Sequence, residues 1–65
     1  MINHFKENIK QLRKESRITQ QQLASALNTT VKTISHWETG YSEPNIDQII
    51  ELSKYFNTPL EDLLT

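Results

Sequence analysis

One stretch of this sequence, from Gln20 to Glu38, constrains the fold more than any other, and it reads QQQLASALNTTVKTISHWE. Thr19, just before it, is a good helix N-cap, and Gln22 three residues later completes a capping box. A helix is therefore predicted over residues 20–27. Asn28 follows, and asparagine tolerates the left-handed backbone at which a helix ends and the chain turns.

After the three-residue turn Asn28-Thr29-Thr30, a second short helix is predicted over residues 31–39. Thr30 is placed to cap this helix, and Gly40 is placed to close it. Two helices this short, joined by so tight a turn, favour a helix-turn-helix over an antiparallel helical hairpin with a long packing interface. The helices of that motif cross at a wide angle, and Ala24 supplies the small residue that the crossing needs.

Three further helices are predicted outside this motif. Apolar residues three and four positions apart predict one helix over residues 2–16 and another over residues 46–56. The run Thr58-Pro59-Leu60-Glu61 provides a cap, a proline at the first helical position and an acid in the first turn, so a fifth helix is predicted over residues 59–64. The other expected boundary residues are a cap at Asn3, a capping box of Asn45 with Gln48, and a left-handed Asn57.

Length and composition bound the fold class. Sixty-five residues make one small domain, and the chain has no cysteine to form a disulfide or a thiolate metal site. We predict a compact all-α domain of five helices over residues 1–65. No apolar run approaches the about 20 residues of a membrane span, and the N-terminus has no apolar signal segment, so a cytoplasmic protein without a membrane partner is expected.

The net charge of −1 conceals an uneven distribution of charge along the chain. Residues 1–36 hold six Lys or Arg and two acids, whereas residues 37–65 hold one Lys and six acids. A domain with a basic half can bind an anion while it stays near neutral overall. Charges that merely solvate helix faces are the alternative, and the charge pattern alone does not separate the two.

Four motifs occur in order along nearly the whole chain: LRKESRITQQQLA at 12–24, the turn NTT, TISHWETGYSEPN at 33–45 and IIELSKYFNTPLEDLL at 49–64. Through these motifs the sequence resembles the Cro/phage-repressor-type, or Xre-like, helix-turn-helix family. The resemblance implies a lambda-repressor-like fold in which the second and third helices form the helix-turn-helix. It also implies a transcriptional regulator, more often a repressor, that binds a palindromic operator in double-stranded DNA as a homodimer.

The helix over residues 31–39 is the expected recognition helix, and the residues nearest its N-terminus reach deepest into a major groove. Its outer face offers hydroxyl groups, a cation and a small apolar group, which suit the edges of bases. Partial burial of Val31 and plain solvation of Lys32 are the alternatives. The predicted base-contacting residues are Thr30, Val31, Lys32, Thr33 and His36.

Two places are expected to contact the DNA backbone. The first turn of the helix over residues 20–27 offers free backbone N–H groups and the positive end of a helix dipole. The resemblance implies that the loop over residues 39–45 lies along the phosphates through backbone N–H groups and short polar side chains, although Glu43 stands where a Lys is common. The predicted phosphate-contacting residues are Arg13, Lys14, Thr19, Gln20, Tyr41 and Ser42.

Two residues of the third helix have expected structural roles. The resemblance implies that Glu38 forms a bidentate ion pair with Arg13, which would tie the first helix to the third. Trp37 is spaced from Ile34 as a core residue is, and this spacing favours burial over a role as a stacking platform for nucleic acid.

The final helix is too short to turn three leucines inward, so at least one of them is expected to face a partner chain. The predicted dimer-interface residues are Leu60, Leu63 and Leu64. A covering segment beyond Thr65 is the alternative. The rival to DNA binding is a protein-interaction module, such as an antitoxin, that holds a basic partner protein through the acidic last two helices.

No catalytic motif is recognisable in this sequence. The chain has one glycine, which excludes a Gly-rich phosphate loop, and its two histidines are far apart in sequence. Its serines lack a recognisable nucleophile setting. Neither an enzyme nor a cofactor nor a small-molecule substrate is therefore expected.

Overall fold

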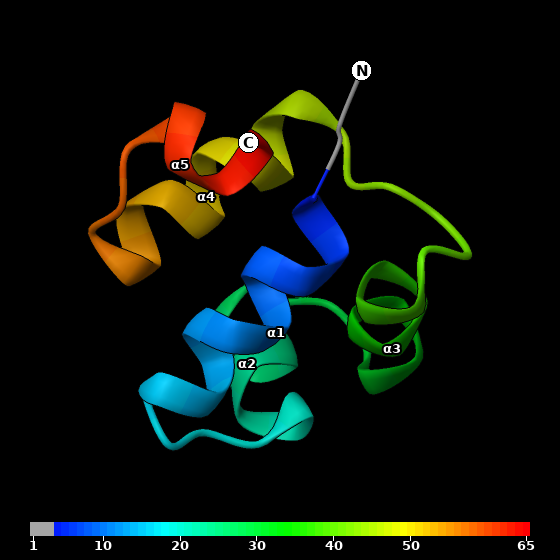
Figure 1. Cartoon of the computed structure of the whole chain (residues 1–65). Coiled ribbons are helices and arrows are strands. Elements are labelled where there is room, and N and C mark those ends of the chain that lie inside the picture. Colours follow the sequence, from blue (N-terminus) through cyan, green and yellow to red (C-terminus); the bar gives the residue numbers. More distant parts are fainter. Residues whose placement is uncertain (1–3) are drawn as a thin grey trace.

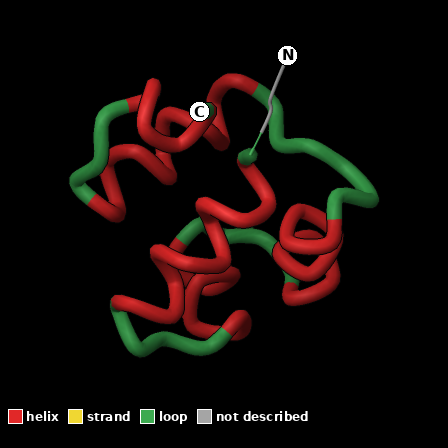
Figure 2. The backbone as a smooth tube through the Cα atoms, in the orientation of Figure 1, coloured by secondary structure: helices red, strands yellow, loops and turns green. Residues whose placement is uncertain are grey.

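The computed structural model describes residues 4–65. This part of the chain forms helices and connecting turns only, which confirms the predicted all-α class (Figures 1 and 2). The predicted cap at Asn3 lies outside the described residues, but the predicted start at residue 2 is wrong, because His4 is the N-cap and the first helix begins at Phe5. The helices are α1 (Phe5–Glu15), α2 (Gln20–Ala26), α3 (Val31–Thr39), α4 (Ile46–Phe56) and α5 (Leu60–Leu64).

Local hydrogen bonds set most of the helix boundaries. At the start of α2, Thr19 Oγ1 accepts from the Gln22 amide at 3.0 Å, and Gln22 Oε1 accepts from the Thr19 amide at 2.8 Å. Asn45 and Gln48 form the same reciprocal box at the start of α4. Both predicted capping boxes are therefore confirmed. The predicted left-handed residues are confirmed as well, at Asn28, Gly40 and Asn57.

The start of α5 differs from the prediction. Pro59 is the N-cap, with ψ of 148°, and the helix begins at Leu60 without a side-chain cap. Thr58 instead donates its hydroxyl to the Phe56 carbonyl at 3.1 Å, and its own carbonyl accepts from Ser53 Oγ at 2.6 Å. These two bonds hold Thr58 in the turn that ends α4, one residue before the N-cap of α5.

The core draws buried side chains from all five helices, with α1 packed on α3 and α5, α2 on α3, and α4 on α5. Figure 1 shows α1 between α2 and α3 on one side and α4 and α5 on the other. Phe5 and Trp37 meet edge to face, with ring centroids 6.4 Å apart. The largest fully buried side chains are Trp37, Ile9, Leu23, Ile34, Leu52 and Leu63. Ala24 is also fully buried, which agrees with its predicted place at the helix crossing.

None of the helices in residues 4–65 combines the length and the apolar character that crossing a membrane requires.

Candidate nucleic-acid interface

The N-terminal end of α3 presents two threonines and a lysine at the molecular surface. Thr30 caps the helix, since its Oγ1 accepts from the Thr33 amide at 3.2 Å, and the two threonine hydroxyls lie 3.0 Å apart. Lys32 is exposed, and within residues 4–65 it takes part in no ion pair. This end of α3 therefore offers two hydroxyl groups and an exposed ammonium within four consecutive residues.

Val31 and His36, the two other residues of the predicted base-contacting set, are half-exposed, as Thr33 is. Val31 packs partly against the core, as the alternative of partial burial anticipated. The imidazole of His36 lies against the phenol ring of Tyr41, with ring centroids 4.5 Å apart and an interplanar angle of 46°. Tyr41 itself is 79% exposed. The contact between these two rings therefore connects the outer face of α3 to the loop that follows it.

Arg13 and Glu38 form a bidentate pair beneath this surface. Arg13 Nε lies 2.6 Å from Glu38 Oε2, and Arg13 Nη2 donates to Glu38 Oε1 at 3.1 Å. The exposed fractions of the two side chains are 13% and 3%. Arg13 Nη1 also donates to the Ile18 carbonyl at 2.9 Å. The pair thus ties α1 to α3 and to the link that leads into α2.

A third side chain joins this pair. Gln20 Nε2 donates to Glu38 Oε1 at 3.0 Å, so the first residue of α2 is bonded to α3. No signal in the sequence pointed to this contact, since Gln20 was expected to face the phosphates. Each terminal nitrogen of Arg13, and the amide nitrogen of Gln20, still carries a second N–H for another acceptor. The predicted phosphate-contacting residues Lys14 and Thr19 are exposed beside them.

The loop after α3 differs from the expectation that its backbone N–H groups face outward. The amides of Tyr41 and Ser42 both donate to the His36 carbonyl, at 2.9 and 3.3 Å. These bonds cap the C-terminus of α3, so the two amides are already paired within the fold. What the loop offers to a ligand at these positions is the side chains of Tyr41 and Ser42, which are exposed.

The prediction that all three leucines of the last helix form a dimer interface is wrong for one of them. Leu63 is 0% exposed and belongs to the core, whereas Leu64 is half-buried and Leu60 is 37% exposed. The reason is that α5 docks on α1. Asn8 Nδ2 donates to the carbonyls of Asp62 and Leu63 at 3.2 and 2.9 Å, which turns Leu63 inward.

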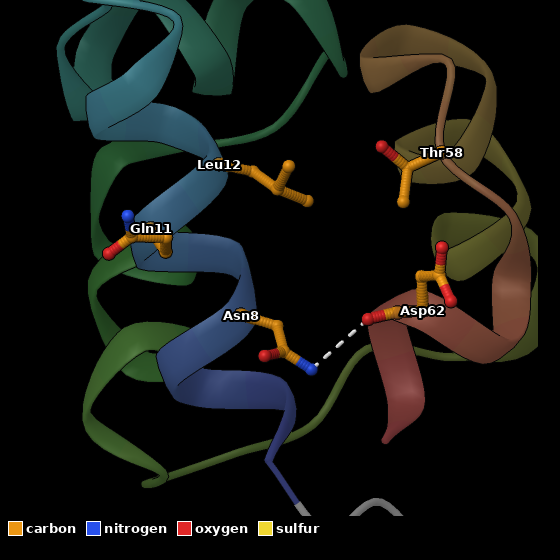
Figure 3. Close-up of a pocket in the computed structure, with 5 residues that line it drawn as sticks. All are labelled: Asn8, Gln11, Leu12, Thr58 and Asp62. Atoms are coloured by element: carbon orange, nitrogen blue, oxygen red, sulfur yellow. Dashed lines mark hydrogen bonds between the residues drawn. The ribbon is translucent and has the colours of Figure 1, made fainter.

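A hollow lies beside this contact between α1 and α5. Figure 3 shows Asn8 reaching from α1 to the backbone of Asp62 across it. Its lining residues are Asn8, Gln11, Leu12, Thr58 and Asp62. The structure brings no group of three or more His, Asp or Glu side chains of residues 4–65 close enough to hold a metal ion.

Comparison with known proteins places this architecture in a family. A helix-turn-helix family model matches residues 9–63. The HTH-type transcriptional activator BcrR of Enterococcus faecalis is 38% identical over 61 residues, which cover 94% of this chain and 30% of that protein. The HTH-type transcriptional regulator YqaE of Bacillus subtilis is 35% identical over 60 residues, which cover 92% of this chain and 52% of that protein. The chain thus spans about half or less of these relatives.

Solved structures agree with this assignment. The P22 c2 repressor protein, in complex with a synthetic operator, superposes with a TM-score of 0.88 at 31% identity, and the match covers 94% of this chain and 92% of that chain. The fold also forms 33% of hydroxypropylphosphonic acid epoxidase from S. wedmorenis, with a TM-score of 0.84 at 27% identity over 94% of this chain. The motifs, the five helices and these matches agree, and the chain belongs to the helix-turn-helix family, of the Cro/phage-repressor type.

Proposed function

We propose that this chain is the DNA-binding domain of a transcriptional regulator and that it recognises a specific sequence in double-stranded DNA. The observation that carries the proposal is the outer face of α3. There the Thr30 and Thr33 hydroxyls lie 3.0 Å apart at the helix N-terminus, and Lys32 is exposed without an ion-pair partner within residues 4–65. The Arg13–Glu38 pair supports it, because it fixes the orientation of that face relative to α1. The names of the two relatives and the operator-bound P22 repressor point the same way.

Each residue of this face has a chemical role in the proposal. Lys32 donates to guanine O6 or N7, and the exposed part of Val31 packs on a thymine methyl group. Thr30, Thr33 and His36 contact base edges or the adjoining phosphates. Such contacts determine which sequence is bound, whereas phosphate contacts determine position and supply salt-dependent affinity. The proposed phosphate-contacting residues are Arg13, Lys14, Thr19, Gln20, Tyr41 and Ser42.

Replacement of Lys32 tests this proposal. We expect Lys32→Ala to weaken binding to a duplex selected by the wild-type protein from a random pool by about 5- to 150-fold, since one good base contact is worth about 1–3 kcal/mol. Mobility shifts measure the change. Lys54→Ala removes an exposed cation from the far end of α4 and is the matched control.

Failure to enrich any duplex, or binding that Lys32→Ala leaves unchanged, would favour the rival protein-interaction module instead. One observation gives that rival some support, because Ile46 and Ile50 lie one turn apart on α4 and are both exposed. The proposal includes both repression and activation of transcription, since BcrR is named an activator and the P22 protein a repressor.

We further propose that two copies of the chain pair through α5, with Leu60 and the exposed edge of Leu64 at the interface. A two-fold pair would place two α3 helices about 34 Å apart and would match a palindromic operator with half-sites one turn apart. Leu63 has no part in this interface, because the core of the same chain already covers it.

Replacement of Leu60 tests the pairing. We expect Leu60→Asp to shift the protein from dimer to monomer in sedimentation equilibrium while the helical circular dichroism stays unchanged, because Leu60 is 37% exposed within one chain. Ile46→Asp places the same charge on an exposed isoleucine at the start of α4 and serves as the control. A wild-type protein that is monomeric both free and on its operator would rule the pairing out.

A further inference from the structure

The loop between α3 and α4 lacks a cation of its own. Residues 41–45 read YSEPN, with one acid and no Lys or Arg. Under the proposed function this loop lies along the phosphates, where an uncompensated carboxylate is unfavourable because duplex DNA is densely negative. Its first two amides are already bonded to the His36 carbonyl, so they supply no compensating N–H groups.

A lysine from another helix lies at the start of this loop. The side chain of Lys6, in the first turn of α1, passes over Gly40, which is the C-cap of α3. A Cβ atom built on Gly40 would stand 3.1 Å from Lys6 Cδ and 3.5 Å from Lys6 Nζ. Figure 1 shows the first turn of α1 beside the chain that leaves α3. The ammonium group of Lys6 is thus delivered to the loop by a residue that lies 34 positions before Gly40 in the sequence.

This ammonium group is available for a ligand. Lys6 is exposed, and the one ion pair within residues 4–65 is that of Arg13 with Glu38. The nearest acid in the loop, Glu43, forms no ion pair with Lys6 in this part of the chain. The packing of the Lys6 methylene groups on Gly40 restricts the positions of Nζ, which reduces the entropy lost when it binds an anion.

We propose that Lys6 contacts a DNA phosphate beside the α3–α4 loop and replaces, from α1, the cation that the loop itself lacks. The proposal rests on the proposed DNA-binding function. Besides its left-handed φ of 82°, Gly40 leaves room for the Lys6 stem, because a Cβ atom there would stand 3.1 Å from Lys6 Cδ, which is tighter than an ordinary van der Waals contact. A lysine acts here as a point charge, which suits a phosphate contact that carries no sequence information.

The competing role for Lys6 is structural. Its ammonium group lies at the C-terminal end of α3, where a cation interacts favourably with the helix dipole. If Lys6 has this structural role, its replacement lowers the thermal midpoint of the free protein. It would leave unchanged the salt dependence of DNA binding, which counts the phosphates neutralised by the protein.

The test compares Lys6→Gln with Lys54→Gln, which change the net charge equally. The dissociation constant for the duplex selected by the wild-type protein is measured between 50 and 300 mM salt, and the thermal midpoint of each free protein is recorded. For Lys6→Gln we expect the slope of log K against log salt to become shallower by about 0.9 per protomer. Near 0.1 M salt the affinity should fall by about eightfold per protomer. This figure is the effect of a slope change of about 0.9 over the tenfold range of salt concentration between 1 M, where the phosphate contact contributes nothing, and 0.1 M. Lys54→Gln and Lys6→Arg should keep the wild-type slope.

Two results would overturn the proposal while the DNA-binding function stands. One is a wild-type slope for Lys6→Gln, with or without a lower thermal midpoint, which would assign Lys6 to the stability of α3. The other is an equal change of slope in Lys6→Gln and Lys54→Gln, which would reflect net charge alone. A wild-type protein that selects no duplex would overturn both proposals together, and this outcome is seen before any Lys6 variant is made.

Discussion

Replacement of Glu38 by alanine is expected to lower the free energy of unfolding by about 3–5 kcal/mol. The Glu38 carboxylate accepts from Arg13 through both oxygens and from Gln20 through one, and its side chain is 3% exposed. Its loss would leave the Arg13 guanidinium group without its counter-charge, on a side chain that is 13% exposed. Breaking a buried ion pair by removing one partner costs more than the pair itself contributes, because the other charge stays buried.

Such a loss is large for a chain of this size. At about 0.05–0.15 kcal/mol per residue, a domain of 65 residues has a total stability of about 3–10 kcal/mol. Glu38→Ala should therefore remove about a third to a half of the stability at the upper end of this range and all of it at the lower end. Urea denaturation followed by circular dichroism measures the change in midpoint and in extrapolated free energy.

Two variants control this experiment. Glu38→Gln keeps an acceptor for Arg13 and Gln20 while it removes the charge, so its loss should be smaller than that of alanine. Glu43→Ala removes an exposed acid from the neighbouring loop and should change the stability by no more than about 0.5 kcal/mol. Equal urea midpoints for Glu38→Ala and Glu43→Ala would show that the buried pair contributes nothing to the fold.

Replacement of Trp37 by alanine is expected to cost about 3–5 kcal/mol of stability through a cavity in the core. Trp37 is 2% exposed and meets Phe5 edge to face, so the removal of its ring would expose an internal void between α1 and α3. Burial of the ring confirms the interpretation drawn from its spacing to Ile34.

The same variant tests the alternative role of Trp37, in which its ring stacks on nucleic acid. Trp37→Phe should retain more of the stability than Trp37→Ala because it fills more of the cavity. Tyr41→Ala removes an aromatic ring that is 79% exposed and should leave the urea midpoint nearly unchanged. If Trp37→Ala kept full stability but lost DNA binding, the ring would belong to the interface and the core assignment would be wrong.

The resemblance to a family supplied the predictions about contacts between residues that are far apart in the sequence. Arg13 and Glu38 are 25 residues apart in the sequence, and no periodicity of one helix relates them. The family motif supplied that pair, and the structure places the two side chains 2.6 Å apart. The base- and phosphate-contacting residues, and pairing through α5, rest on the same resemblance and stay predictions until binding is measured.

Local signals in the sequence were enough to predict the boundaries of the three middle helices, α2, α3 and α4, to within one residue. The boxes at Thr19 and Asn45 and the left-handed positions at Asn28, Gly40 and Asn57 are all confirmed. These capping boxes and left-handed positions can be recognised in the sequence because the donor, the acceptor and the strained backbone lie within a few residues of one another along the chain.

How the helix faces meet depends on contacts between residues that are distant in the sequence. Leu63 turned inward because Asn8 of α1 holds the end of α5, and a helix of five residues has no periodicity that could have shown this. The bond from Gln20 to Glu38 and the position of Lys6 over Gly40 likewise join residues that are far apart in sequence. Such contacts depend on the packing angles of whole helices, which the side chains of the core set together and no single local pattern records.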